Sequence, residues 1–225
     1  VRQMVGRLDT KETVLERLAA LKAYGQCSVV IDLIYGLPGQ TMEVWEQDLA
    51  DLVSSGVDGA DLYQLNVFDG SDLNRDIASG KVPPAATTSM QGDMFEFGRT
   101  YLEARAYRRL SAAHWSANNR ERSLYNILAK AGVPMFPFGS GAGGNVDGYG
   151  MMLHRALKPY EDMVSRGEKP FMALMKQSDL QPFVNQVVSQ LEQGYLDINT
   201  LVAMDSRLDE LNWLYKLWEK RGLVS

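Results

Sequence analysis

A helix followed by an apolar strand recurs three times in the first half of the chain, and this repeat constrains the fold most. The first two helices begin at the capping residues Asp9 and Thr41 and end at Gly25 and Gly56, and each leads into β-branched and aliphatic residues. Such a repeat is typical of a βα barrel or a doubly wound parallel sheet. Three units are too few to close an eight-stranded barrel, so we expect a partial parallel sheet. The pattern predicts helices within residues 9–25, 41–56 and 88–107 and strands at 28–35, 60–67 and 109–115.

After Val133 the pattern changes to short strands, a glycine-rich loop and helices. Methionine and aromatic side chains at helical spacing in this region are typical of a core rather than of a cofactor site. We therefore divide the chain into residues 1–145 and a mostly helical region, 146–225. Short strands are expected at residues 133–138 and 149–153, and helices at about 159–166, 180–193 and from Ser206, with Asp209 completing a capping box, to before Gly222.

Composition excludes several classes of protein. With 225 residues, 45% of them apolar, the chain can bury a real core, while a net charge of −5 and a pI near 5.1 argue against a nucleic-acid binder. No apolar run approaches the roughly 18 residues of a membrane span. The single cysteine, Cys27, excludes a disulfide framework, fits a reducing cytoplasm and cannot by itself hold zinc or an iron–sulfur cluster. Because the chain opens on Val1 in mid-pattern, we expect a fragment of a longer protein.

Asp32 stands in the middle of the apolar run "VVIDLIYGLPGQT" of residues 29–41. Glycines on both sides of the run predict a short strand buried on both faces, as in a parallel sheet. An ionised carboxylate there costs several kcal/mol, roughly, unless hydrogen bonds or a ligand compensate it. The residue pattern is compatible with a structural aspartate or with a ligand contact at the strand's carboxyl end, where α/β sites lie.

Three other groups are candidates for chemistry. The glycine loop 139–144 lacks the immediate helix that a dinucleotide fingerprint needs, so a turn is favoured over phosphate binding. His114 and His154 are too far apart in sequence to form a local metal motif, although His114 ends the third predicted strand. Arginines around that strand suit either a solvated face or carboxylate recognition: Arg105, Arg108, Arg109, Arg120 and Arg122.

Five segments carry a resemblance to a known family. The motifs "VRQMVGR" (1–7), "IDLIYGLPGQT" (31–41) and "LYQLNVF" (62–68) resemble, in order and spacing, the oxygen-independent coproporphyrinogen III oxidase branch of the radical S-adenosylmethionine (SAM) enzymes. The segments "AAHWSANNRERSLYN" (112–126) and "FPFGSGAGG" (136–144) are more similar to its anaerobic haem-degrading members, the anaerobilin synthases. The resemblance implies an α/β fold, the C-terminal half of a TIM-like βα barrel, followed by the helical region.

The resemblance also implies a SAM site. Arg7 and Asp32 match residues that contact SAM in that branch, and Tyr63 matches an aromatic that packs near the adenosyl group. Asp32 would offer two acceptor oxygens to ribose hydroxyls. The family's CxxxCxxC motif is absent from this sequence, so the ligands of the 4Fe–4S cluster would lie upstream of Val1. The 225 residues alone are predicted to be inactive.

For substrate, the resemblance implies a tetrapyrrole, with haem ring opening and methyl transfer from SAM, and a flavodoxin-type electron donor. Coproporphyrinogen III decarboxylation and a haem chaperone of the same fold are the alternatives, and a plain α/β binding domain is a third. His114 is a candidate iron ligand, and Arg120 and Arg122 are candidate propionate contacts. The competing interpretation is that His114 hydrogen-bonds within the barrel while the arginines are solvated.

Overall fold

The computed structural model describes residues 1, 6, 8–205 and 209–224. The chain forms two compact units, Val1–Ser123 and Leu124–Ser225, and each is described here by itself. The barrel boundary at residue 145 stays a prediction. No helix within the described ranges is long and apolar enough to cross a membrane.

The first unit begins with the two helix–strand pairs that the sequence predicts. Helix α3 lies between the predicted strand 60–67 and the predicted helix 88–107, where no helix was predicted, and Ser71 caps it by accepting from Asn74 N. In chain order the elements are α1 (Lys11–Tyr24), β1 (Val30–Tyr35), α2 (Met42–Ser55), β2 (Gly59–Gln64), α3 (Asp72–Ala78), α4 (Thr88–Glu103), β3 (Arg108–Arg109) and β4 (His114–Ser116).

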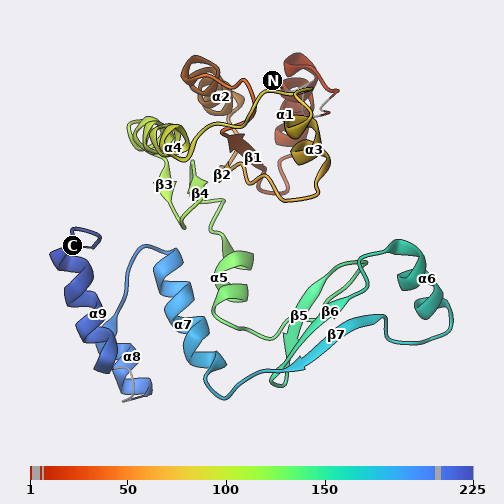
Figure 1. Cartoon of the computed structure of the whole chain (residues 1–225), viewed down its shortest axis with the longest axis vertical. Coiled ribbons are helices and arrows are strands. Elements are labelled where there is room, and N and C mark those ends of the chain that lie inside the picture. Colours follow the sequence, from red (N-terminus) through yellow and green to blue (C-terminus); the bar gives the residue numbers. More distant parts are fainter. Residues whose placement is uncertain (2–5, 7, 206–208, 225) are drawn as a thin grey trace. The chain divides into compact units, whose positions relative to one another are not determined.

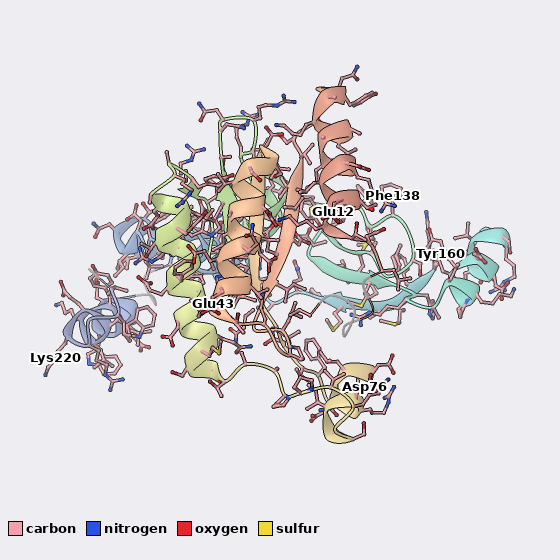
Figure 2. The ribbon with its side chains drawn as sticks, turned by 90° about the horizontal axis from the view of Figure 1, so that it is seen from above. Glu12, Glu43, Asp76, Phe138, Tyr160 and Lys220 are labelled. Atoms are coloured by element: carbon pink, nitrogen blue, oxygen red, sulfur yellow. The ribbon has the colours of Figure 1, made fainter. Side chains whose placement is uncertain are left out.

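Local side-chain chemistry sets the ends of the first two helices. Thr10, rather than the predicted Asp9, caps α1 by accepting from Thr13 N, while Asp9 pairs with Arg17. Thr41 caps α2 in the same way. Both helices carry an acid in the first turn, Glu12 and Glu43, labelled in Figure 2.

The four-stranded sheet has the order β1-β2-β4-β3. Strands β1 and β2 are parallel, as predicted, but β4 runs antiparallel to β2, and β3 antiparallel to β4. The prediction of one parallel strand at 109–115 is therefore wrong. The chain reverses at Ser111, because the backbone N–H groups of Leu110 and Ser111 donate to His114 O, and Ser111 Oγ accepts from His114 N. A hairpin stands where a continuous strand was expected.

One face of this sheet packs on α4, which contacts β1, β2 and β3, and α2 packs against α4. Figure 1 shows α2 next to β1 and α4 next to β3. Trp45 of α2 is fully buried and donates its indole N–H to Met94 O of α4 over 2.8 Å. Gly98 permits the close packing, since a Cβ there would lie 3.2 Å from Leu62 Cδ1 and from Trp45 Cζ2. The other face of β1 is open, so the expectation of a strand buried on both faces is wrong: Asp32 and Ile34 are exposed.

The second unit combines helices with a three-stranded antiparallel sheet of order β5-β6-β7. Strand β6 confirms the strand predicted at 149–153, whereas β7 was missed and the strand expected at 133–138 is reduced to one bridge, Met135 with Asn145. The capping box expected at Ser206 falls on residues outside those described. The elements are α5 (Leu124–Lys130), β5 (Gly143–Val146), β6 (Tyr149–Leu153), α6 (Leu157–Ser165), β7 (Phe171–Lys176), α7 (Gln181–Glu192), α8 (Ile198–Met204) and α9 (Asp209–Lys220).

Candidate functional site

A row of ionisable side chains crosses the face of the first sheet that is open at β1; Asp32 is exposed, whereas Asp61 and His114 are buried. In the strand register Asp32 of β1 is the partner of Asp61 of β2, and Asp61 is the partner of His114 of β4. Paired residues of neighbouring strands project from the same face, so these three side chains lie on one side of the sheet. One pair further along, Ile34 is the partner of Tyr63, and their side chains are 38% and 43% exposed.

The turn that follows β1 is held by the residues of its own motif. Gly36 has φ +85, and a Cβ at this position would lie 2.6 Å from Gln91 Nε2. Both the backbone conformation and the packing therefore favour glycine. Gln40 is buried and accepts from Leu37 N over 3.1 Å. Its amide also donates to Asp48 Oδ2 of α2 over 3.2 Å. Packing and turn geometry therefore account for the segment "YGLPGQ", which leaves Asp32 as the chemical member of the motif.

Asp58, directly before β2, is the most deeply buried of the carboxylates beside the sheet, whereas Asp32 is exposed. The side chain of Asp58 is 1% exposed and accepts from Val29 N over 2.9 Å, from Asn118 Nδ2 over 2.9 Å and from Lys22 Nζ over 3.1 Å. Burial alone would raise the pKa of Asp58, but these hydrogen bonds and the Lys22 charge outweigh it and lower the pKa. Asp58 therefore has a structural role, joining α1, β1 and the segment after β4.

Asp32 has a different environment. The residue is exposed, which corrects the expectation that it is buried in the strand. Partial desolvation, and then the neighbouring charge of Asp61, raise the pKa of the Asp32 carboxyl, while His114 works in the opposite direction. Asp32 is exposed, whereas the Asp58 side chain is 1% exposed, so Asp32 is the more accessible of the two carboxylates.

His114 lies between two carboxylates. Its side chain is 5% exposed; Nδ1 is 3.0 Å from each carboxylate oxygen of Asp61, and Nε2 is 3.3 Å from Glu121 Oε1. The hydrogen bond to Asp61 raises the pKa of His114, against the effect of burial, and the charges of both acids add to it. The sequence analysis missed Asp61 and Glu121. Asp61 stands in an apolar strand just as Asp32 does, and the same criterion applied to β2 would have found it.

The predicted site residues are only partly brought together. Asp32, Tyr63 and His114 lie on the same face of the sheet, where Asp32 and Tyr63 are exposed and His114 is buried. Arg7 lies outside the described residues. Arg120 donates to Gly25 O and Cys27 O, each over 2.9 Å, and so braces the segment that precedes β1. Arg122 is exposed.

The open face fits an adenosyl group but not an iron–sulfur cluster. A carboxylate suits ribose hydroxyls, and the exposed Ile34 and Tyr63 beside it offer an apolar and aromatic surface. Cys27 is exposed, and among the described residues no group of three His, Cys, Asp or Glu side chains could hold a metal ion.

The second unit contains an apolar hollow of about 580 Å³. Aliphatic and aromatic side chains form most of its lining, and two of the aromatic ones, Phe138 before β5 and Tyr160 on α6, are labelled in Figure 2. Phe136 and Phe138 are 70% and 87% exposed, and Lys169 adds a cation to the lining. A volume of this size matches ordinary small-molecule pockets, which are mostly apolar with a few polar groups.

Comparison with individual known proteins identifies relatives of this chain, whereas no family model matches its sequence. Its sequence is 31% identical over 224 residues to anaerobilin synthase from Escherichia coli O157:H7, covering 99% of this chain and 49% of that protein. It is 22% identical over 171 residues to the heme chaperone HemW of Bacillus subtilis, covering 75% of this chain and 44% of that protein. The chain spans about half the length of the curated relatives it matches.

A solved structure shows the fold. The radical SAM enzyme coproporphyrinogen III oxidase (HemN) from Escherichia coli superposes with a TM-score of 0.72 over 92% of this chain and 50% of that one, at 16% sequence identity. Together with the sequence relatives, this fold places the chain among the radical SAM proteins. Within them, the chain belongs to the HemN-like branch, which resembles oxygen-independent coproporphyrinogen III oxidase.

Proposed function

We propose that these residues are part of a radical SAM enzyme that degrades haem without oxygen, by ring opening and methyl transfer. Similarity to anaerobilin synthase across 99% of this chain at 31% identity carries the proposal, since similarity to the heme chaperones HemW extends over 75% and 85% of the chain at 22% and 26% identity. SAM bound beside a reduced 4Fe–4S cluster supplies radical chemistry and a methyl group to such enzymes. The cluster ligands are not among these 225 residues, which contain one cysteine, so the proposal concerns a longer protein.

In this proposal the open face of the first unit holds SAM. Asp32 accepts from the ribose hydroxyls, and Tyr63 packs against the adenosyl group, with Arg7 as a further SAM contact. Asp32 and Tyr63 are both exposed, which supports the assignment, because a ligand can reach these side chains without a rearrangement of the first unit. Charge-assisted hydrogen bonds to the carboxylate orient the sugar.

The tetrapyrrole is assigned to the apolar hollow of the second unit. A planar, largely apolar macrocycle with carboxylates at its edge suits exposed phenylalanines beside Lys169. Contacts to haem from His114, Arg120 and Arg122 stay a prediction. For His114 to ligate iron through Nε2, its contact with Glu121 must break, and Arg120 is occupied with backbone carbonyls.

An anaerobic assay of the longer protein tests the function. The cluster-loaded protein is mixed with haem, SAM and a reductant such as reduced flavodoxin, and we expect loss of the Soret band together with consumption of SAM. A parallel reaction with coproporphyrinogen III should release no carbon dioxide; release would identify the oxidase instead.

A haem chaperone is the second candidate, favoured by the similarity to HemW over 171 residues. Such a protein would bind haem and leave the Soret band intact in the presence of SAM and reductant. A protein that binds neither SAM nor haem would contradict both proposals and indicate a plain α/β binding domain.

A further inference from the structure

Both ring nitrogens of His114 face carboxylate oxygens, an arrangement that favours two hydrogen-bond donors on one ring. Both carboxylate oxygens of Asp61 face Nδ1, and Glu121 Oε1 faces Nε2. Glu121 Oε1 also accepts from Ser123 N, so this oxygen acts as an acceptor. A neutral imidazole has one N–H, whereas the imidazolium has two. The geometry therefore describes a buried imidazolium that donates in two directions.

The two directions lead to different parts of the first unit. Through Nδ1 the ring holds Asp61, the partner of Asp32 in the strand register. Through Nε2 it holds Glu121, whose backbone carbonyl also accepts from Ser116 Oγ. Glu121 belongs to the segment that ends the first unit at Ser123, a residue with φ 52.

The neighbourhood is shaped to admit Glu121. A Cβ at Gly59 would lie 3.0 Å from Glu121 Cγ and 2.8 Å from Trp115 O, so a larger residue would force either the side chain or the backbone to move. The Glu121 side chain is 15% exposed and the Asp61 side chain 11% exposed. Carboxylates removed from water require compensation, and here one ring contacts both the buried Asp61 and the partly buried Glu121.

We propose that His114 is a positioning residue with two contacts, which we call its arms. Nδ1 fixes the carboxylate of Asp61, next to the SAM-binding Asp32, and Nε2 fixes Glu121 in the segment 117–123 that ends the first unit. This inference rests on the proposed function only for the identity of the ligand. It assigns His114 a place between the SAM site and the segment 117–123 rather than on the haem iron. With both arms made, the imidazolium offsets the charge of Asp61, so that Asp32 meets its ligand as an ionised acceptor.

Two amide variants separate the arms. The shorter amide of His114→Asn places a nitrogen donor near the position of Nδ1, so this variant keeps the Asp61 contact. The longer amide of His114→Gln places its nitrogen donor near the position of Nε2, so this variant keeps the Glu121 contact. SAM affinity of the longer protein is measured by calorimetry, and amide hydrogen exchange reports on Ser123 and its neighbours. His154→Asn and His154→Gln serve as matched controls, and thermal melts check folding.

We expect the two His114 variants to differ in opposite directions in SAM affinity and in hydrogen exchange. His114→Gln should weaken SAM binding by about tenfold, as for one hydrogen bond to a charged group, and leave exchange in 117–123 close to wild type. His114→Asn should lose less SAM affinity but accelerate exchange at Ser123. Glu121→Gln, which keeps the side-chain volume, should accelerate exchange with SAM affinity kept.

Two outcomes would overturn the inference, and a third would contradict only the proposed function. Equal effects of His114→Asn and His114→Gln on both measurements would show a merely structural histidine. Ring-nitrogen NMR shifts of a neutral tautomer at pH 6 would contradict the imidazolium. Failure of the wild-type protein to bind SAM would contradict the proposed function, while the exchange measurement would still test the Glu121 arm.

Discussion

Nδ1 of His114 lies 3.0 Å from both carboxylate oxygens of Asp61, across the antiparallel pair of β2 and β4. This contact stabilises the fold when His114 is protonated, because the hydrogen bond to Asp61 raises the pKa of His114 above its ordinary 6.5. The charge of Glu121 acts in the same direction.

The first prediction is a loss of stability at alkaline pH. A group whose folded pKa is raised contributes stability that is fully present below its unfolded pKa and is lost as pH rises through the folded pKa. We therefore expect the melting temperature to fall from about pH 6.5 upward, an unperturbed histidine's pKa. In His114→Gln the decline should be smaller, whereas His154→Gln should follow wild type. An unchanged pH profile in His114→Gln would contradict the prediction.

The second prediction concerns the buried carboxylate. Asp58→Ala removes the acceptor of Val29 N, Asn118 Nδ2 and Lys22 Nζ, and leaves a buried N–H unpaired. Lys22 is partly exposed and can be hydrated, so the cost comes mainly from the unsatisfied buried N–H, about 1–3 kcal/mol, and chemical denaturation should show a loss of about that size. Asp32→Ala, at an exposed position, is the matched control and should lose little.

Asp58 also predicts behaviour in acid. Its folded pKa is lowered below the ordinary 3.8, so its contribution is present above the unfolded pKa and is lost as pH falls through the folded value. Stability of the wild-type protein should fall below about pH 4, the unperturbed value for aspartate, and the fall should be shallower in Asp58→Asn. Equal slopes in the two proteins would show that another carboxylate controls acid unfolding.

The sequence predicts the first two helix–strand pairs because their signals are local: apolar periodicity, a capping residue at the start of each helix and a glycine at its end. The capping residue of α1 was displaced by one position, since Thr10 and Asp9 are both able to cap. The third strand could not be predicted as a hairpin, because its reversal depends on contacts between Ser111 and His114 that no periodicity records. Strand β7 was missed for a similar reason, since its apolar run does not alternate.

The site was predicted less completely than the fold. Asp32, Tyr63 and His114 were selected individually, and the register that aligns Asp32, Asp61 and His114 appears only when the strands pair. Burial of Asp32 could not be judged from its strand, because the helices cover the opposite face. Arg120 was assigned to haem from its closeness in sequence to His114, whereas its guanidinium turns to Gly25 and Cys27.

The third prediction separates stability from ligand binding at Asp32. Desolvation and the charge of Asp61 raise the pKa of this carboxyl, so the folded state loses stability as pH rises from the unfolded pKa through the raised folded pKa. Asp32→Asn removes that loss, and the ligand-free protein should melt at the same temperature as wild type or higher at pH 7. SAM binding should weaken by roughly 1–3 kcal/mol, because charge-assisted hydrogen bonds to the ribose are lost.

Calorimetry on the longer, cluster-loaded protein and a thermal melt of the same sample check both parts of this prediction. Asp76→Asn, at a surface carboxylate paired with Lys81 on the α3 segment, is a suitable control for the loss of one negative charge. Unchanged SAM affinity in Asp32→Asn, with the melt as expected, would return Asp32 to a structural role.

The last prediction concerns haem. Phe138 lines the hollow of the second unit and is 87% exposed, so Phe138→Ala should cost the fold little while removing aromatic contact from a bound macrocycle. Titration of haem into the longer protein should show weaker binding for Phe138→Ala and a Soret maximum unchanged for His114→Ala, since Glu121 already occupies Nε2. Phe68→Ala, at a phenylalanine 72% exposed on the first unit, controls for the loss of an exposed aromatic. A shifted Soret maximum in His114→Ala, with His154→Ala unaffected, would instead establish His114 as the iron ligand, and unchanged affinity in Phe138→Ala would remove the hollow from the haem site.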